Sequence, residues 1–420
     1  MHQQNSKIFY ICLMLRKSLI IFCFVNHILC YAQQQDSLVF KNGIDRPSIL
    51  ATHHFGIFSA RINNNFKQLP SKKNALSINY TSGNNFHPFV EAYLPRDPVV
   101  REQQRQKIWY QRDFVFENQE TTPADYMNIV IDAIIKEFRV NYNITLNKKS
   151  ELNITLRSYL ISNGKYPFSF FTSDESIEWF HSNIAGGEDP FGRRYYGLNQ
   201  VNFRYLDRNG RTLELNTNDF FIGGLELNHF YYPNFLRNKD KHIYTNIGSH
   251  LGINTSRFNS ALDYGVSINS IKQLVFKSQN ILSFGLGGSV LHKNFLNFKN
   301  SNIDLGNNRL LASFEGHIEF TKYTKKGNYN AFGINYHIQS RFNKKEEAGY
   351  YRLLGKWREI NGGWHNGVAT LYNTLSDWTA IYTYATPTYK LSLFCKQDLE
   401  VNNAPDFQTG ISLILPFGNK

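Results

Sequence analysis

The chain has 420 residues and carries 46 Lys and Arg against 33 Asp and Glu, a formal net charge of +13. Charged residues make up only 19% and aromatic residues reach 15%, which is unlike a disordered chain or a typical helical soluble enzyme. The mean hydropathy of −0.41 excludes a polytopic helical membrane protein, because that class needs repeated apolar runs of about 20 residues. Together these properties favour an all-β chain of the outer-membrane barrel class, whose strands alternate apolar and polar residues.

The first 32 residues predict a secretory signal peptide. Basic residues precede the apolar run 18–25, which is too short to span a bilayer as a retained helix, and Ala32 stands at the expected cleavage site. A lipoprotein signal with Cys30 as the lipidated residue is an alternative, but the residues before Cys30 are bulky where such signals have small ones. We expect a mature chain that begins at Gln33 and whose single cysteine, Cys395, leaves no intramolecular disulfide.

The mature chain divides into two parts. Residues 33–74 are polar and resist assignment to strands, so we expect an N-terminal extension or a plug. Residues 75–420 form the predicted barrel, with long loops at 83–106 and 162–198.

The clearest strands lie in residues 138–160. Residues 138–147 alternate apolar and polar side chains, and after a polar turn at 147–150 the alternation resumes. Two matched strands of about ten residues suit a tilted crossing of a bilayer. Weaker alternation elsewhere gives further strand candidates, among them residues near 127–135, 199–206 and 211–217. Together the candidates predict a transmembrane antiparallel β-barrel of about 14 strands, with 12 to 16 allowed and an even number expected.

A second hairpin, at 312–342, predicts which side chains face lipid and which face the lumen. Phe314, Ile318, Ile334 and Ile338 share the apolar parity. Because a charge facing lipid at mid-depth is costly, the polar parity is expected to face the interior. The lumen-facing candidates are Glu315, His317, Glu319, Asn335, His337 and Arg341.

These luminal groups have two interpretations. They form either a hydrated polar wall, which we favour, or a site that binds a metal or filters ions, with Glu315 opposite His337. We therefore predict no metal site, no cofactor and no catalytic residue. In the run 285–288, glycines are expected to let strands bend or pack closely.

The loop 162–198 contains a predicted helix over 174–184. Asp174 is its expected cap, and Trp179 and Phe180 are expected to be buried as the loop closes over one mouth of the barrel. The distinctive residues of this loop are Trp179, Phe180, His181, Arg193 and Arg194.

This middle region resembles a family of uncharacterised Gram-negative outer-membrane β-barrel proteins. The resemblance is strongest over residues 125–230 and rests on the run 176–181, a Gly-rich turn and Arg193-Arg194, all following the hairpin 138–161. A Gly-Asp step that tends to begin the next strand in that family is replaced here by Gly223-Gly224-Leu225. The resemblance implies a barrel and brings no established activity.

Three functions remain open at this point. A non-catalytic barrel that passes or binds a small solute is favoured, and the alternatives are a lipid-modifying enzyme and a plugged structural or surface-interaction barrel. None of the 13 His has a Ser two residues away, the spacing that outer-membrane lipid hydrolases use on one strand face. The expected location is the bacterial outer membrane. Expected partners are its lipid and lipopolysaccharide, the barrel-assembly machinery and a small solute, with no nucleic acid.

Overall fold

The computed structural model describes residues 41–48, 53–87, 129–164, 168–185, 198–207, 209–276, 280–324, 327–342, 374–397 and 407–418. The predicted signal peptide, Arg193, Arg194 and most of loop 83–106 lie outside these residues. No helix in this part of the chain is long and apolar enough to cross a membrane.

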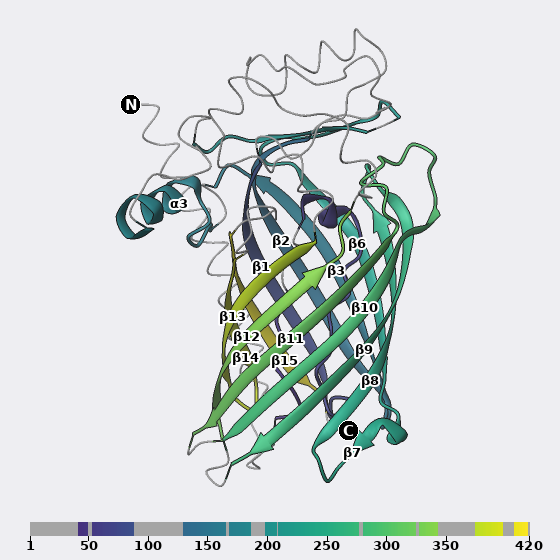
Figure 1. Ribbon diagram of the computed structural model, residues 1–420, viewed down its shortest axis with the longest axis vertical. Coiled ribbons are helices and arrows are strands. Elements are labelled where there is room, and N and C mark those ends of the chain that lie inside the picture. Colours follow the sequence, from purple (N-terminus) through teal and green to yellow (C-terminus); the bar gives the residue numbers. More distant parts are fainter. Residues whose placement is uncertain are drawn as a thin grey trace.

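Long antiparallel strands form a closed barrel (Figure 1). Each wall strand pairs with the wall strand before it and the wall strand after it in the chain. Strand β1 closes the barrel by pairing with both β2 and β15. The wall strands are β1 (Asn74–His87), β2 (Ile129–Asn147), β3 (Ser150–Ser162), β6 (Phe220–Tyr231), β8 (Ile243–Thr255), β9 (Ser260–Val275), β10 (Ile281–Asn297), β11 (Leu310–Tyr323), β12 (Tyr329–Gln339), β13 (Leu375–Ala385), β14 (Lys390–Gln397) and β15 (Phe407–Phe417).

Within the described residues the wall has 12 strands, which lies in the expected range but below the expected 14. Two errors explain the difference. The candidates near 127–135 and 138–147 are one strand, β2, of 19 residues. The candidates near 199–206 and 211–217 form a hairpin of β4 (Asn202–Leu206) and β5 (Thr212–Leu215), which extends the sheet from β2 beyond the wall.

Smaller elements lie near the two ends of the barrel. Strand β7 (Arg237–Asn238) and helix η4 (Asn234–Leu236) lie in the connection from β6 to β8. Helix α3 (Asp174–Phe180) continues as the π-helical turn η3 (His181–Ala185), and a 3-10 turn, η1 (His54–Phe58), precedes β1. Strand β1 runs to His87, so the first residues of the predicted loop 83–106 are strand.

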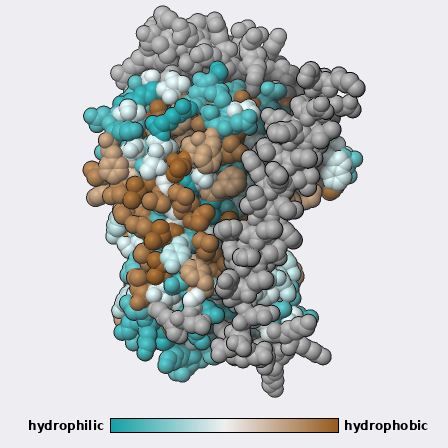
Figure 2. All heavy atoms as spheres, turned by 180° about the vertical axis from the view of Figure 1, so that it is seen from behind, coloured by the Kyte–Doolittle hydropathy of each residue, from teal (hydrophilic) through white to brown (hydrophobic). Residues whose placement is uncertain are grey.

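The polarity of the wall is the reverse of a soluble protein. On β11 and β12, the apolar Phe314, Ile318 and Ile334 are about half exposed, whereas Glu315 and Glu319 are buried. The face in Figure 2 shows a hydrophobic band between hydrophilic ends. A closed barrel with an outward apolar band and polar inward groups is the architecture of a transmembrane β-barrel.

The two ends of the barrel differ. Tight turns join β2 to β3 at residues 147–150 and β13 to β14 at 386–389, and both lie at the lower end in Figure 1. The β4–β5 hairpin, the connection from β10 to β11 and α3 lie at the upper end. Transmembrane barrels keep short turns in the periplasm, and the turns at the lower end are of that kind.

Replacing Ile318 with Arg tests the outward face. The guanidinium would enter the lipid at a cost of about 2–4 kcal/mol if it lies near mid-depth, so we expect a markedly lower yield of heat-modifiable, folded barrel on gels. Ile318→Phe keeps the site apolar and should fold at the wild-type level. Equal yields for the two variants would contradict the lipid-facing assignment.

Candidate functional site in the barrel lumen

A hairpin of chain fills the lumen below the upper mouth. We call residues 41–48 and 53–73 the inner segment. Its two arms meet through the bridge between Gly43 and Lys67 and a hydrogen bond from Ile44 N to Phe66 O of 3.0 Å. The segment starts near the lower end, where Lys41 N donates to Tyr323 Oη at 2.7 Å, and it returns there to enter β1. The inner segment therefore lies inside the barrel without crossing the membrane.

Buried ion pairs hold the first arm to the wall. Lys41 pairs with Asp45 at 2.7 Å and also with Glu319 of β11. Asp45 pairs in turn with Lys390 of β14 at 2.8 Å and accepts a hydrogen bond from Tyr329 Oη at 2.8 Å. Two carboxylates and two ammonium groups thus neutralise one another away from bulk water.

The ionised forms of Asp45 and Lys41 are favoured by their partners. Burial alone would raise the pKa of the Asp45 carboxyl, but Lys390 and Lys41 hold that pKa well below its usual value. Burial alone would lower the pKa of the Lys41 ammonium, but Asp45 and Glu319 raise it above its usual value. The charges of Asp45 and Lys41 therefore persist across the physiological pH range.

Glu315 of β11 joins both arms of the inner segment. It pairs with Arg46 of the first arm and accepts from Asn64 Nδ2 of the second arm at 2.8 Å. Asn335 Nδ2 donates to the same carboxylate at 2.5 Å. The Glu315 carboxylate thus accepts hydrogen bonds from the inner segment and from the wall. No group of three or more metal-ligating side chains occurs in the part of the chain that the structure describes.

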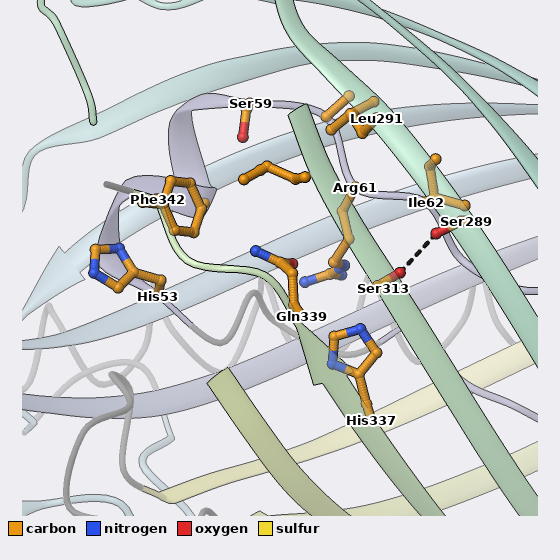
Figure 3. A pocket seen from close by; sticks show the side chains of 13 residues that line it. His53, Ser59, Arg61, Ile62, Ser289, Leu291, Ser313, His337, Gln339 and Phe342 are labelled. Atoms are coloured by element: carbon orange, nitrogen blue, oxygen red, sulfur yellow. Dashed lines mark hydrogen bonds between the residues drawn. The ribbon is translucent and has the colours of Figure 1, made fainter. Parts of the chain in front are cut away.

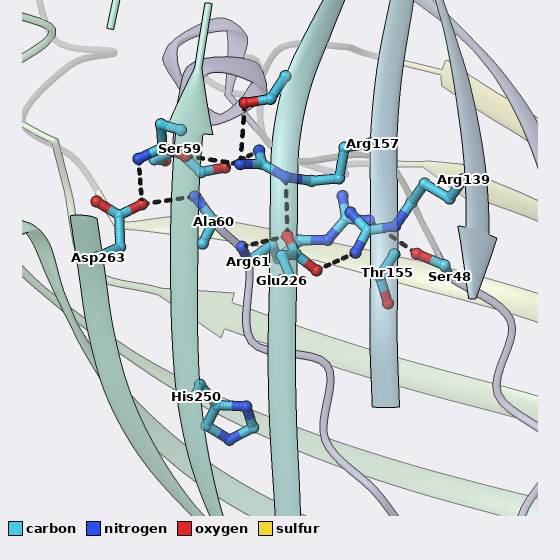
Figure 4. A network of polar contacts seen from close by, with 12 residues as sticks. Ser48, Ser59, Ala60, Arg61, Arg139, Thr155, Arg157, Glu226, His250 and Asp263 are labelled. Carbon is cyan, nitrogen blue, oxygen red and sulfur yellow. Dashed lines mark hydrogen bonds and ion pairs between the residues drawn. The ribbon is translucent and has the colours of Figure 1, made fainter. Parts of the chain in front are cut away.

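Glu226 of β6 organises a second cluster, shown in Figure 4. It pairs with Arg139 of β2 and with Arg157 of β3, the latter at 3.2 Å, and it accepts from the backbone N of Arg61 at 3.1 Å. The Arg61 side chain lies 3.5 Å from Glu137. Arg139 and Arg157 are completely buried, so each depends on these carboxylates for compensation of its charge.

Two further wall carboxylates bind the returning arm. Asp263 accepts from Ala60 N at 2.7 Å. Glu151 accepts from Asn65 Nδ2 at 2.7 Å, from Lys67 Nζ at 2.9 Å and from Ser71 N at 3.0 Å. The inner segment is thus bound by charged groups on several sides of the wall.

Glycines on the inner wall make room for this segment. A Cβ at Gly252 would come within 2.2 Å of Ala60 Cβ, and one at Gly285 would come within 2.8 Å of the Phe66 ring. At Gly287 the nearest atom would be Asn64 Cγ, at 2.8 Å. Gly285 and Gly287 therefore allow the inner segment to approach the wall, whereas the prediction for the run 285–288 was that neighbouring strands bend or pack closely there.

The tip of the inner segment has an apolar environment. Phe55, Ile57 and Phe58 of η1 belong to a buried cluster with side chains of the β4–β5 hairpin, including Phe203 and Leu213. Phe258 and Phe342 from other upper connections complete it. The extra hairpin thus packs onto the tip at the upper mouth.

A cavity remains beside the tip, facing β10 to β12 (Figure 3). Its volume for groups the size of a water molecule is about 30 Å³, which is room for a few waters or one small polar group, and it opens to solvent. Polar side chains line it alongside Ile62, Leu291, Leu311 and Phe342. They are His53, Ser59, Arg61, Ser289, Ser313, His337 and Gln339. The cavity is the candidate site for a small polar ligand.

The luminal residues singled out from the sequence lie in two places. Glu315, His317, Glu319 and Asn335 are buried inside the wall, and the strand register pairs Glu315 with His337. His337 is half-buried at the cavity, 3.3 Å from Asp377. Arg341 lies beyond the end of β12, where its carbonyl accepts from Asn308.

The predicted helix in the loop 162–198 forms, but its aromatic side chains are exposed rather than buried. Ser173, rather than Asp174, caps α3, because its hydroxyl accepts from Ser176 N at 3.3 Å. Trp179 is 58% exposed and Phe180 48% exposed, so the prediction that they are buried was wrong. The described part of this loop contacts the outer side of the wall rather than closing over the mouth, because polar groups of β1 and β2 bind it there.

Sequence reasoning missed one arrangement that spans three strands. His250 Nδ1 lies 2.7 Å from Asn228 Oδ1, and His250 Nε2 lies 2.8 Å from Ser267 Oγ. This order of groups matches a nucleophile, a base and an orienting residue. A His–Ser spacing along one strand does not reveal this arrangement, because the three residues meet only through the register of β6, β8 and β9.

The arrangement lacks the access that acyl transfer requires. Ser267 is buried and therefore closed to a substrate, and its oxygen also accepts from Asn269 Nδ2 at 3.2 Å. An attacking oxygen needs open space in front of it for the reacting atom. The triad is thus better suited to holding the inner wall together.

Comparison with known proteins does not place the chain in a family. No family model matches the chain, and no curated protein matches it. An outer-membrane channel from Pseudomonas putida F1 is similar, with 11% identity and a TM-score of 0.38 over 83% of this chain and 97% of that one. LpxR from Salmonella typhimurium has 8% identity and a TM-score of 0.37 over 82% and 100% of the two chains.

An OmpT loop-deletion mutant, an outer-membrane protein of Vibrio cholerae, has 7% identity and a TM-score of 0.25 over 82% and 98% of the two chains. Likenesses this distant leave the activity of the present chain open. The protein is a bacterial outer-membrane β-barrel, and the closed wall with its inverted polarity carries that conclusion.

The Glu226 cluster can be tested by Glu226→Gln. This change leaves the buried guanidiniums of Arg139 and Arg157 without their shared carboxylate, so we expect a loss of about 3–5 kcal/mol in unfolding free energy, measured by urea titration. Glu214→Gln is the control, because the exposed Glu214–Arg204 pair is worth about 1 kcal/mol at most. Equal midpoints for the two variants would contradict the account of this cluster.

Proposed function

We propose that this protein is a gated outer-membrane barrel that binds a small polar solute at its upper mouth, with the inner segment as its plug. The observation that carries the proposal is the occupation of the lumen by the inner segment, residues 41–48 and 53–73. Buried carboxylates of the wall bind this segment at Glu151, Glu226, Glu315 and Glu319. A solute could cross the barrel only if the inner segment moved.

The cavity beside the tip supports the binding half of the proposal. It is open at one side, and it combines Arg61 and two imidazoles with hydroxyl and amide groups. Such groups suit a solute that carries hydroxyl or anionic groups. Because His53, Ser59, Arg61 and Ile62 belong to the inner segment, a ligand there would contact the plug directly, which links binding to opening.

Conductance in planar bilayers tests the gate. We expect the wild-type barrel to show no steady open channel. Deleting residues 41–68 should remove the plug and produce stable openings in a barrel that still shows heat-modifiable migration on gels. A wild type that conducts steadily, or a folded deletion variant that stays closed, would contradict the gating proposal.

The second candidate function is hydrolysis by the Asn228–His250–Ser267 arrangement. We expect Ser267 to stay unlabelled by a fluorophosphonate probe in the folded barrel, because it is buried and already hydrogen-bonded. A soluble serine hydrolase treated in parallel shows that the probe is active. Labelling that disappears in Ser267→Ala would instead identify a nucleophile and favour the enzyme.

A further inference from the structure

A stretch of the loop after β3 lies against the outside of the barrel and presents aromatic side chains outward. We call residues 168–185 the outer segment. It crosses the seam where β1 meets β15 and β2: Tyr80 Oη donates to Phe168 O at 2.5 Å, and Thr409 Oγ1 donates to Phe170 O at 2.6 Å. Figure 1 shows α3 outside the barrel, near its upper end.

The side of the outer segment that faces the wall is polar. Asn84 Nδ2 donates to Asp174 Oδ1 at 2.9 Å and to Thr172 O at 3.0 Å. Lys136 Nζ donates to Ser82 Oγ at 2.7 Å and to Ser169 Oγ at 2.5 Å. Ser82, Asn84 and Lys136 point away from the lumen, yet all three are buried beneath this segment.

The side that faces away from the wall is mainly apolar, with Glu175, Ser182 and Asn183 as its exposed polar residues. Six large hydrophobic side chains there are between 48% and 74% exposed, namely Phe168, Phe170, Phe171, Trp179, Phe180 and Ile184. On α3 the buried positions are instead Asp174 and Glu178. A helix packed on a protein in water buries its apolar face and exposes its polar one. The outer segment does the opposite, as the barrel wall does.

Position along the wall agrees with this polarity. The outward Ile78, Tyr80, Phe138 and Val140 belong to the apolar face of β1 and β2 directly below the segment. Ser82 follows Asn74 by eight residues, which is about 26 Å along a strand and about 20 Å of height at a tilt of about 40°. When the start of β1 at Asn74 is taken as the lower boundary of an apolar band about 25 Å tall, the segment starts near the upper boundary.

The irregular backbone of the segment also meets the requirement for lipid contact. Non-helical chain at membrane depth needs a partner for its backbone polar groups, because lipid offers none. The carbonyls of Phe168, Phe170 and Thr172 all accept hydrogen bonds from side chains of the wall. The chain can therefore enter the acyl-chain boundary without exposing those acceptors.

We propose that the outer segment is a membrane-docking surface, seated in the headgroup–acyl boundary of the outer leaflet with its six hydrophobic side chains in lipid. Tryptophan and phenylalanine at this depth fix a barrel or an interfacial helix in the membrane. The segment would thereby set the height of the barrel and cover the seam between β1 and β15.

Quenching of Trp179 fluorescence tests the proposal. The full protein is reconstituted in phosphatidylcholine vesicles, with or without spin-labelled phosphatidylcholine, and the contribution of Trp179 is the difference between wild type and Trp179→Phe. Trp378→Phe is the matched control, because Trp378 is 45% exposed on the outer face of β13. We expect lipid quenching of Trp179 to reach at least half that of Trp378, and aqueous iodide to have little effect on either.

Two outcomes would overturn the proposal. Quenching of Trp179 by iodide and not by the labelled lipid would place the segment in water. Quenching by neither reagent would mean that protein covers it, for example a second copy of the chain. Should Trp179→Phe fold poorly, the fluorescence gained in Phe171→Trp is read in the same way.

Discussion

Buried carboxylates on the inner wall are the constraint on which the rest of the lumen depends. Glu151, Glu226, Glu315 and Glu319 point inward from three strands, β3, β6 and β11, and are almost completely buried. An isolated buried carboxylate is too costly to persist as an ion, so each requires donors and cations close by. The wall supplies Arg139, Arg157 and Lys390, and the inner segment supplies Lys41, Arg46 and Lys67. The barrel and the inner segment therefore complete each other electrostatically.

The inner segment has polar arms and an apolar tip, and each part matches the side chains that it contacts. Its arms are polar where they meet the charged wall, and glycines at 252, 285 and 287 allow them to approach closely. Its tip is apolar where it meets Phe203 and Leu213 of the extra hairpin. Charge neutralisation along the arms and hydrophobic packing at the tip act at different heights, so opening the lumen requires both to be broken.

The sequence predicted the structure correctly where the alternation of apolar and polar residues determines which face of a strand a side chain lies on. Alternation on 312–321 and 332–342 placed Glu315, His317 and Asn335 on one face, and the short turn predicted the pairing of Glu315 with His337. The extra hairpin β4–β5 has the same alternation as a wall strand, so the period could not distinguish it from the wall and the strand number came out too high. Lys136 and Ser82 break the lipid-facing parity, and only the contact with residues 168–172 explains why.

The candidate site depended on contacts between residues far apart in the sequence. The partners of Glu226 come from β2, β3 and the inner segment, and no spacing along the chain reveals that meeting. The triad of Asn228, His250 and Ser267 is likewise set by the register of neighbouring strands. Trp179 and Phe180 were expected to be buried because a helical apolar face usually meets protein, a rule that reverses beside lipid.

A disulfide cross-link tests whether the inner segment lies within the barrel in the membrane. A Cβ at Gly287 would lie 2.8 Å from Asn64 Cγ, so Asn64→Cys with Gly287→Cys should form a disulfide in the folded protein after small local shifts. The matched control pairs Asn64→Cys with Leu286→Cys, whose side chain is 57% exposed on the opposite face of the same strand. Both are made with Cys395→Ser and examined by the shift of the oxidised protein on gels. We predict a cross-link in the first pair and none in the second; no cross-link in the first pair, or equal cross-linking in both, would contradict the account.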